Sequence, residues 1–266
     1  MIEGGNEVIK SLVKMFNEII NTKQIPKQWK MMTIKSIYKG AGSIFEMTNR
    51  RGLFMTNIIS KIFERVIKNR NEPALDQSLI QYQCGGIKHR STIDHVMTLM
   101  AILDKNRYLK KPTYIIFADA EKCFDKLWLQ DGIKELRGAG TDMVDCHIIN
   151  KMNSEALAVI DTPIGRTDEI ELKDIVRQGT IYGPKICGIT TDKVNNIGEK
   201  TVTVYNTNVD VESLIYVDDI MGAGSKNMVE GVVRNLRQME TLKKFTFNTK
   251  KTKYMIIKTN KKQKAE

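Results

Sequence analysis

Three aspartates that follow apolar runs are the residues of this chain whose types and spacing could do chemistry. Asp218 and Asp219 lie between two short apolar runs, which predicts a β-hairpin with the acids at its turn. Neighbouring strand side chains point to opposite faces, so we expect one acid to be a direct ligand and the other a supporting carboxylate. Taken alone, this stretch is better explained as a solvated Asp-Asp turn.

Asp119 supplies a second acidic position, because it ends the β-branched and aromatic run 113–118. If its strand neighbours the hairpin, the carboxylates suit two Mg²⁺ ions, because Mg²⁺ takes oxygen ligands and is bound by protein carboxylates and substrate phosphates together. Mn²⁺ is an alternative ion. Such a pair, about 4 Å apart, activates an attacking oxygen and stabilises the leaving one. The acids and the basic composition together predict nucleotidyl transfer with nucleic acid as the partner, which the spacing alone would not show.

Composition supports that partner. The 266 residues carry a net charge of +11, with 41% hydrophobic and 27% charged residues, as in a globular protein of one large domain or two lobes. The charge favours nucleic acid over a membrane surface as a polyanionic partner. Part of the excess lies in a basic C-terminal tail, for which a solvated tail is the simpler interpretation.

Cysteine spacing excludes two further classes of protein. Cys84, Cys123, Cys146 and Cys187 form no paired pattern, which argues against a zinc site and a disulfide framework and for a reducing compartment. No apolar run is long enough to cross a bilayer, and the N-terminus lacks the regions of a signal peptide. We therefore expect an intracellular chain, nuclear or cytoplasmic, with no membrane partner.

Hydrophobic periodicity predicts an α+β protein. Helices are expected near 9–23, 56–68, 92–103, 126–136, 184–197 and 227–243, and strands near 32–38, 113–118, 156–160, 169–176, 214–217 and 254–258. Ser91 or Thr92 is the expected N-cap of the third helix. Residues 49–52 are interpreted as a basic loop that could hold phosphate. From residue 113 the order of elements predicts an antiparallel sheet with helices on one face.

An ordered set of motifs carries a resemblance to a known family. The motifs are Tyr38-Lys39-Gly40, Asn49 to Gly52, Ser60 to Glu64, Gln83 to Thr92, Phe117 to Asp125, Arg177-Gln178-Gly179, Tyr216 to Asp219 and Asn248 to Thr252. Together they resemble the fingers and palm of a reverse transcriptase, above all those of non-LTR (LINE-like) retrotransposons. The resemblance implies a right-hand polymerase fold, with fingers at 1–111, a palm at 112–258, a basic tail at 259–266 and the thumb missing.

The resemblance also implies roles for the acidic residues. Asp119 would bind metal with help from the backbone carbonyl of Ala120, and Asp218 and Asp219 would be the catalytic pair, all of them metal ligands. Phe124 would be the steric gate that excludes a ribose 2′-hydroxyl. Packing under the sheet is the alternative explanation of that ring.

Five further residues would bind the incoming deoxynucleoside triphosphate. Gln178 and Gly179 would line its pocket, and Lys39 and Arg51 would reach its phosphates from the fingers. Lys251 matches a lysine that protonates pyrophosphate in the family, although basic neighbours on both sides make the match ambiguous.

Several positions depart from the family pattern. Arg50 stands where the family has an aromatic residue, Gly86 and Ile87 replace Phe-Arg, and Gly183-Pro184 replaces Ser-Pro. The chain also begins after the family's first fingers block and ends before the primer grip and thumb.

Two hypotheses of different classes follow. The first is an RNA-directed DNA polymerase fragment that uses an RNA template, a DNA primer and deoxynucleoside triphosphates. The second is a catalytically inactive relic that binds RNA or a partner. An RNA-templated RNA polymerase is a third reading, which Phe124 disfavours. The oligomeric state is left open.

Overall fold

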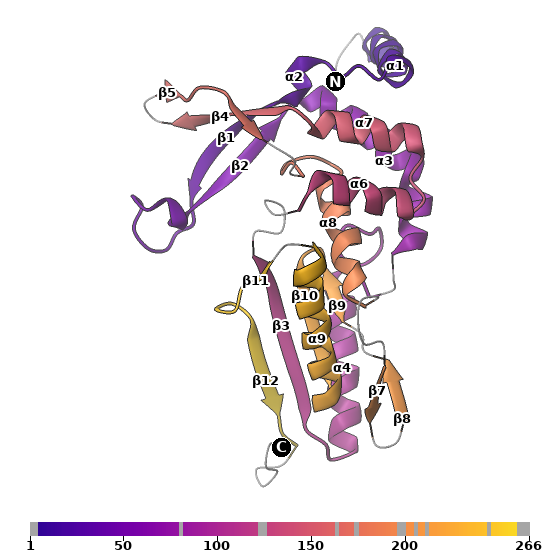
Figure 1. Cartoon of the computed structure of the whole chain (residues 1–266), viewed down its shortest axis with the longest axis vertical. Helices are drawn as coiled ribbons and strands as arrows, with labels where there is room; N and C mark the ends of the chain where they lie inside the picture. The colour runs from indigo at the N-terminus through magenta and orange to yellow at the C-terminus, as the bar shows by residue number, and fades with distance from the viewer. Residues whose placement is uncertain are drawn as a thin grey trace. The chain divides into compact units, whose positions relative to one another are not determined.

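The computed structural model describes residues 5–79, 82–121, 127–162, 165–172, 176–195, 201–204, 207–210, 213–243 and 246–259 (Figure 1). The chain forms two compact units, each made of two separate stretches. Unit 1 comprises Met1–Leu75 and Trp128–Gly183, and unit 2 comprises Asp76–Leu127 and Pro184–Glu266. The boundaries expected for fingers and palm stay predictions, because a division by contacts does not test them.

Unit 1 contains a mixed sheet in the order β2-β1-β4-β5, with β6 also paired to β4. Its strands are β1 (Met31–Tyr38), β2 (Arg50–Thr56), β4 (Ala156–Thr162), β5 (Gly165–Arg166) and β6 (Ile170–Leu172). β1 pairs with β2 antiparallel and with β4 parallel. Two expectations were therefore wrong. Residues 50–52 belong to a strand instead of a loop, and the 156–172 hairpin extends the sheet of β1, away from the one that carries Asp119.

The helices of unit 1 pack around an aromatic cluster. They are α1 (Gly5–Thr22), α2 (Lys27–Lys30), α3 (Ile58–Ser78, which ends in unit 2), α6 (Leu129–Gly138) and α7 (Met143–Asn153), with a 3₁₀ turn at Met47–Asn49. The rings of Phe16, Trp29 and Phe63 have centroids 5.1–6.2 Å apart and are almost fully buried. Edge-on and tilted aromatic contacts of this kind hold α1, α2 and α3 together.

Helix α3 extends ten residues beyond its expected end near residue 68. Asn71 and Glu72, which follow that expected end, are buried, and Asn71 Nδ2 donates to Asp145 Oδ2 of α7 at 2.7 Å. Tertiary contacts thus override weak local propensity and carry the helix past Pro73.

Unit 2 is built on an antiparallel sheet in the order β11-β3-β10-β9, with β12 also paired to β3. The strands are β3 (Thr113–Glu121), β9 (Leu214–Tyr216), β10 (Asp219–Gly224), β11 (Thr246–Phe247) and β12 (Lys253–Ile257), and a separate hairpin joins β7 (Thr201–Val204) to β8 (Thr207–Asp210). The antiparallel sheet expected from residue 113 is confirmed for these strands.

Two helices pack on this sheet: α4 (Thr92–Tyr108) and α9 (Lys226–Lys243) both contact β3 and β10. Unit 2 also contains α8 (Gly183–Asp192) and a 3₁₀ turn at Lys193–Asn195, so the helix expected over 184–197 ends earlier than predicted. A Cβ at Gly222 would lie 2.9 Å from Val232 Cγ2, because α9 approaches β10 closely there. On the opposite face Phe117 is 41% exposed, so the face that carries Asp119 is partly open.

The described helices include none that is both long and apolar enough to span a membrane.

Helix α4 begins with a capping box. Ser91 Oγ accepts from Ile93 N at 3.2 Å, and Asp94 Oδ2 accepts from Ser91 N at 2.7 Å. We expect Ser91→Ala to lower the free energy of unfolding by about 1 kcal/mol, because it leaves a helix N–H without its acceptor. Urea unfolding measures this. Thr98→Ala, in the exposed middle of the same helix, should change it by less, and an equal loss in both variants would contradict the assignment of the cap.

Candidate active site

The predicted acids meet in unit 2. Asp219, the first residue of β10, lies directly opposite Asp119 of β3, and Asp218 immediately precedes it in the turn. Directly opposite residues on neighbouring strands share one face, so the carboxylates of Asp119 and Asp219 lie on the same side of the sheet. The expectation that the two acidic positions lie on adjacent strands is confirmed.

The turn that presents Asp218 is strained. Tyr216 pairs with Asp219, which leaves Val217 and Asp218 as a two-residue hairpin loop. Val217 has φ +57°, an uncommon conformation for a β-branched residue. Such strain persists only where surrounding contacts impose it, and it concentrates at functional sites.

Gln83 and Thr191 supply those contacts. The fully buried Gln83 Oε1 accepts from Gly85 N at 2.8 Å and from Val217 N at 3.1 Å, and Gln83 Nε2 donates to the Gly188 carbonyl at 3.2 Å. Thr191 Oγ1 donates to the Val217 carbonyl. Sequence reasoning placed Gln83 at the start of a family motif and in a loop before Gly85 and Gly86, and gave it no role of its own.

Gly85 lies against the strained residue. A Cβ at Gly85 would be 2.4 Å from Val217 N, so a side chain there must displace the turn. We expect Gly85→Ala to lower the free energy of unfolding by about 1–3 kcal/mol, as overpacking does. Gly138→Ala is the control, because nothing lies within 4 Å of its added Cβ. Urea unfolding that shows equal stability for both variants would refute the close packing.

Burial and neighbouring acids raise the pKa values of Asp218 and Asp219. The pKa of Asp218 is raised, first by burial and then by the charges of Asp219 and Asp119. The pKa of Asp219 is raised by loss of hydration and by the charge of Asp119. Lys251 opposes both shifts. A bound cation would relieve the same repulsion more strongly.

Lys251 reaches Asp119 from the turn between β11 and β12. Asn248 N donates to the Asp119 carbonyl at 2.8 Å, and the Asn248 side chain accepts from Lys250 N and Lys251 N. Lys251 Nζ lies 2.9 Å from Asp119 Oδ2, with its own side chain 68% exposed. The contact is an ion pair whose angles do not meet those of a hydrogen bond, since this buried oxygen has no hydrogen-bond partner among the described residues. Lys251 is thus a lysine that the turn brings to Asp119, whereas Lys253 Nζ donates to the Lys250 carbonyl.

The donor set suits a hard divalent cation. Carboxylate oxygens are the ligands that Mg²⁺ takes, and the buried Oδ2 of Asp119, which pairs with Lys251, is such an oxygen. Ala120, whose carbonyl was also expected to help, follows in β3 opposite Phe247. Among the described residues, however, no three His, Cys, Asp or Glu side chains lie close enough to hold a metal. The acids would have to draw closer around an ion.

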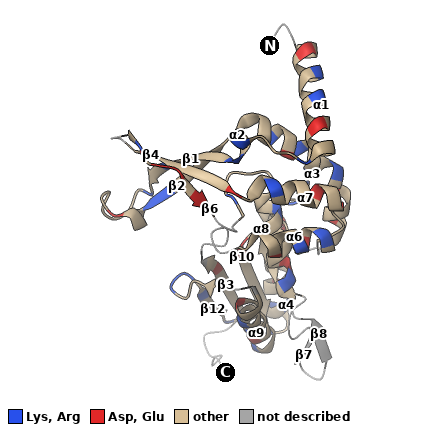
Figure 2. Cartoon of the chain, turned by 45° about the horizontal axis from the view of Figure 1, so that its top comes forward, with Lys and Arg blue, Asp and Glu red and all other residues tan. Residues whose placement is uncertain are grey.

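Four of the residues expected to bind the nucleotide, Lys39, Arg51, Gln178 and Gly179, lie in unit 1 and are described by themselves. Lys39 Nζ donates to the Thr48 carbonyl at 2.8 Å, and Arg51 is an exposed residue of β2 opposite Ile37. Gln178 is half-buried and Gly179 is exposed. Figure 2 shows Lys and Arg along α1, α2 and β2 of this unit. Phe124, the expected steric gate, lies outside the described residues.

A hairpin that presents paired acids from an antiparallel sheet is the arrangement expected of a nucleotidyl-transfer palm. The family model "Reverse transcriptase (RNA-dependent DNA polymerase)" matches residues 14–265, so the chain belongs to that family. This confirms the family predicted from the motifs.

Curated relatives lie among transposon proteins. The chain is 28% identical over 124 residues to a probable RNA-directed DNA polymerase from transposon BS of Drosophila melanogaster. It is 26% identical over 128 residues to the one from transposon X-element of the same species. Each match covers 46% of this chain and 14% of the relative. These relatives support the predicted non-LTR retrotransposon type.

Solved structures support the polymerase fold. Apo telomerase from Candida tropicalis, truncated from its C-terminal domain, matches with a TM-score of 0.63 and 15% identity over 88% of this chain and 51% of that one. Telomerase from the same species in complex with a fragment of telomeric RNA matches with 0.64 and 14% identity over 94% and 44%. At this identity the likeness concerns the fold alone.

Proposed function

We propose that this chain is the catalytic module of an RNA-directed DNA polymerase, which adds deoxynucleotides to the 3′-hydroxyl of a DNA primer paired with an RNA template. One observation is the main support for the proposal. Asp219 lies opposite Asp119, and the neighbouring Asp218 lies in a strained turn that buried side chains hold in place. Family membership and the transposon relatives agree with it. The reaction would take place inside the cell, in the nucleus or cytoplasm.

The acidic residues would hold two Mg²⁺ ions. Asp119, Asp218, Asp219 and the Ala120 carbonyl are the proposed ligands, and Mn²⁺ is an alternative ion. The bound pair would supply activation of the primer hydroxyl and stabilisation of the leaving pyrophosphate. The raised pKa values of Asp218 and Asp219 fit acids whose repulsion a cation offsets.

Basic and aromatic residues would orient the substrate. Lys39 and Arg51 would pair with its phosphates, and Lys251, already beside Asp119, would give a proton to the pyrophosphate. Gln178 and Gly179 would contact the nucleotide. Phe124 would select deoxyribose, because a ring against C2′ leaves no room for a hydroxyl.

Primer extension tests the proposal. Purified protein, poly-rA/oligo-dT, Mg²⁺ and dTTP should give extended primer, and Asp218→Ala, Asp219→Ala should abolish it while circular dichroism stays unchanged. Asp104→Asn is the control, because it removes a carboxylate that is 68% exposed on α4. It should extend as the wild type does.

Two results would contradict the proposal. One is extension that survives in the double variant, which would mean a contaminating polymerase. The other is a folded wild-type chain that binds RNA without extending any primer. That second result would favour the catalytically inactive relic.

A further inference from the structure

The turn that bears Gln178 is buried at Arg177 and Thr180 and exposed at Gly179 between them. Residues 177–181, which we call the Gln178 turn, begin with Arg177, whose side chain is 1% exposed. Thr180 is also buried, whereas Gly179 is exposed and Gln178 half-buried. A turn of this kind displays two residues while the rest of the protein controls its shape.

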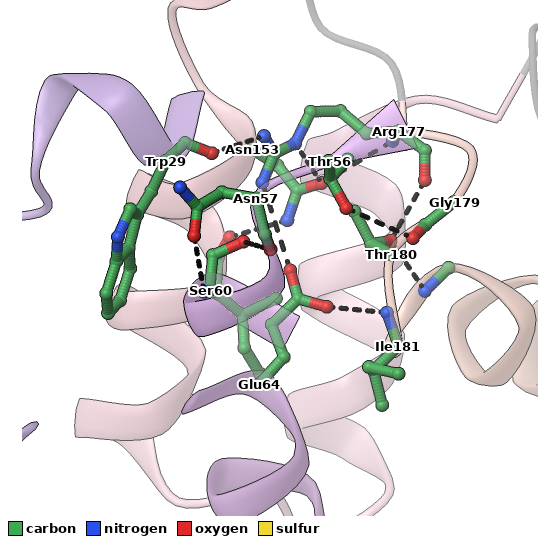
Figure 3. A network of polar contacts seen from close by, with 12 residues as sticks. Trp29, Thr56, Asn57, Ser60, Glu64, Asn153, Arg177, Gly179, Thr180 and Ile181 are labelled. Atoms are coloured by element: carbon green, nitrogen blue, oxygen red, sulfur yellow. Dashed lines mark hydrogen bonds and ion pairs between the residues drawn. The ribbon is translucent and has the colours of Figure 1, made fainter. Parts of the chain in front are cut away.

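Arg177 ties the start of the turn to three elements of unit 1 (Figure 3). Its Nη1 donates to the Trp29 carbonyl at 3.1 Å, and its Nε donates to Asn153 Oδ1 at 3.3 Å. Its Nη2 lies 3.9 Å from Glu64 Oε1 of α3. The planar guanidinium fixes several directions at once, which a lysine could not do.

Glu64 contacts both ends of the turn. Besides its ion pair with Arg177, its Oε2 accepts from Ile181 N at 2.5 Å. Thr180 Oγ1 closes the loop internally by donating to the Arg177 carbonyl at 2.9 Å. One buried side chain from α3 therefore spans the turn that carries Gln178.

Gly179, at the exposed tip of the Gln178 turn, also contacts β2. Gly179 has φ +79°, and a Cβ there would lie 2.6 Å from the Phe54 carbonyl oxygen. Thr56 Oγ1 donates to the Gly179 carbonyl at 3.4 Å. Only glycine fits this approach, so the exposed backbone of the turn is held from the side of the strand that carries Arg51.

Stability alone does not explain the buried charges. Burial raises the pKa of Glu64 and lowers that of Arg177, which means that both charged forms lose hydration. Buried ion pairs often contribute no more to stability than apolar residues of the same size. What this pair supplies, and apolar residues would not, is a set of directional contacts at both ends of one turn.

We propose that Glu64, acting through Arg177 and the Ile181 N–H, is a positioning residue that holds the Gln178 turn in the shape that receives the incoming deoxynucleotide. The proposal rests on the proposed function, and assigns a role to a helix residue that does not itself touch the nucleotide.

Glu64→Gln tests the proposal, because it keeps the length and an acceptor for Ile181 N while removing the charge that faces Arg177. Asp76→Asn is the matched control. It breaks another ion pair, that of Asp76 Oδ1 with the buried Lys185 Nζ at 2.5 Å, which lies in unit 2 and involves neither Glu64 nor Arg177. Hydrogen exchange of the 178–183 amides and steady-state primer extension are measured on both.

We expect Glu64→Gln to speed exchange of these amides at least about tenfold, and Asp76→Asn to leave it unchanged. The KM for the deoxynucleotide should rise roughly 10- to 100-fold in Glu64→Gln, with kcat and primer–template affinity close to those of the wild type. A milder variant, Thr56→Val, should raise the KM roughly two- to tenfold, as loss of one hydrogen bond would, and serves if Glu64→Gln does not fold.

Three results would overturn the positioning role: unchanged exchange in Glu64→Gln, faster exchange with an unchanged KM, or an equal rise of KM in the control. A wild-type chain that extends no primer is a different failure, because it removes the proposed function. The exchange comparison still decides whether Glu64 holds the turn.

Discussion

Asp119→Asn is expected to lower the rate of primer extension at least about a thousandfold while leaving the fold intact. The amide keeps the shape of the side chain but removes the charge that faces Asp219 across the strand pair. It also replaces a carboxylate, the ligand type that Mg²⁺ prefers. The melting temperature should not fall, because the charge of Asp119 raises the pKa of Asp219 and its removal relieves that repulsion.

Single-turnover extension measures the rate, and titration with Mn²⁺ followed by electron paramagnetic resonance measures ion binding without turnover. Asp104→Asn, which also removes one acid from unit 2, should keep both properties of the wild type. An Asp119→Asn protein that retains more than about a tenth of the wild-type rate would show that this acid is no metal ligand.

Arg177→Met is expected to lower the free energy of unfolding by about 3–5 kcal/mol. Methionine fills much of the space but leaves Glu64 buried with its charge uncompensated, and it removes the donors to Asn153 and Trp29. Breaking one side of a buried pair is costly for this reason, even where the pair itself contributes little.

The deficit should depend on pH. Burial raises the pKa of Glu64 above its ordinary 4.5, and loss of Arg177 raises it further. The folded protein then binds a proton more readily than the unfolded chain, so stability rises as the pH falls through the folded pKa. The deficit of Arg177→Met should therefore be full near neutral pH and shrink towards pH 4.5.

Urea unfolding at about pH 5 and about pH 8 measures the effect. Arg107→Met is the control, since Arg107 is 81% exposed and 4.0 Å from its acidic partner, and it should shift stability by less than about 0.5 kcal/mol at either pH. A deficit that is small, or the same at both pH values, would contradict the buried pair.

The sequence predicted best the elements whose local pattern agrees with their surroundings. β3 contains the apolar run 113–118, and Asp119, which follows that run, lies opposite Asp219 of the predicted hairpin. β2 was interpreted as a loop because it begins with two arginines and a glycine; pairing with β1 overrides that preference. α7 was not predicted at all, although the Asp142 side chain caps it by accepting from Val144 N and Asp145 N.

The acids of the site could be predicted because a carboxylate indicates metal binding by its residue type alone. The residues that position the acids could not be predicted in this way. Gln83 contacts Val217 across 134 positions, and Glu64 contacts Ile181 across 117. Nothing in a linear pattern indicates such partners, since glutamine in a loop and glutamate on a helix are usually solvated. The Lys251 motif was found, but its ion pair with Asp119 needed the turn that Asn248 forms.

The measurement that tests the central claim most directly is the choice of nucleotide on an RNA template of defined sequence. Four reactions each contain the purified chain, a DNA primer, Mg²⁺ and one deoxynucleoside triphosphate. The account predicts that only the nucleotide complementary to the next template base is added, and that Asp119→Asn adds none. Addition that ignores the template, or no addition by a folded chain that has bound the primer and template, would contradict it.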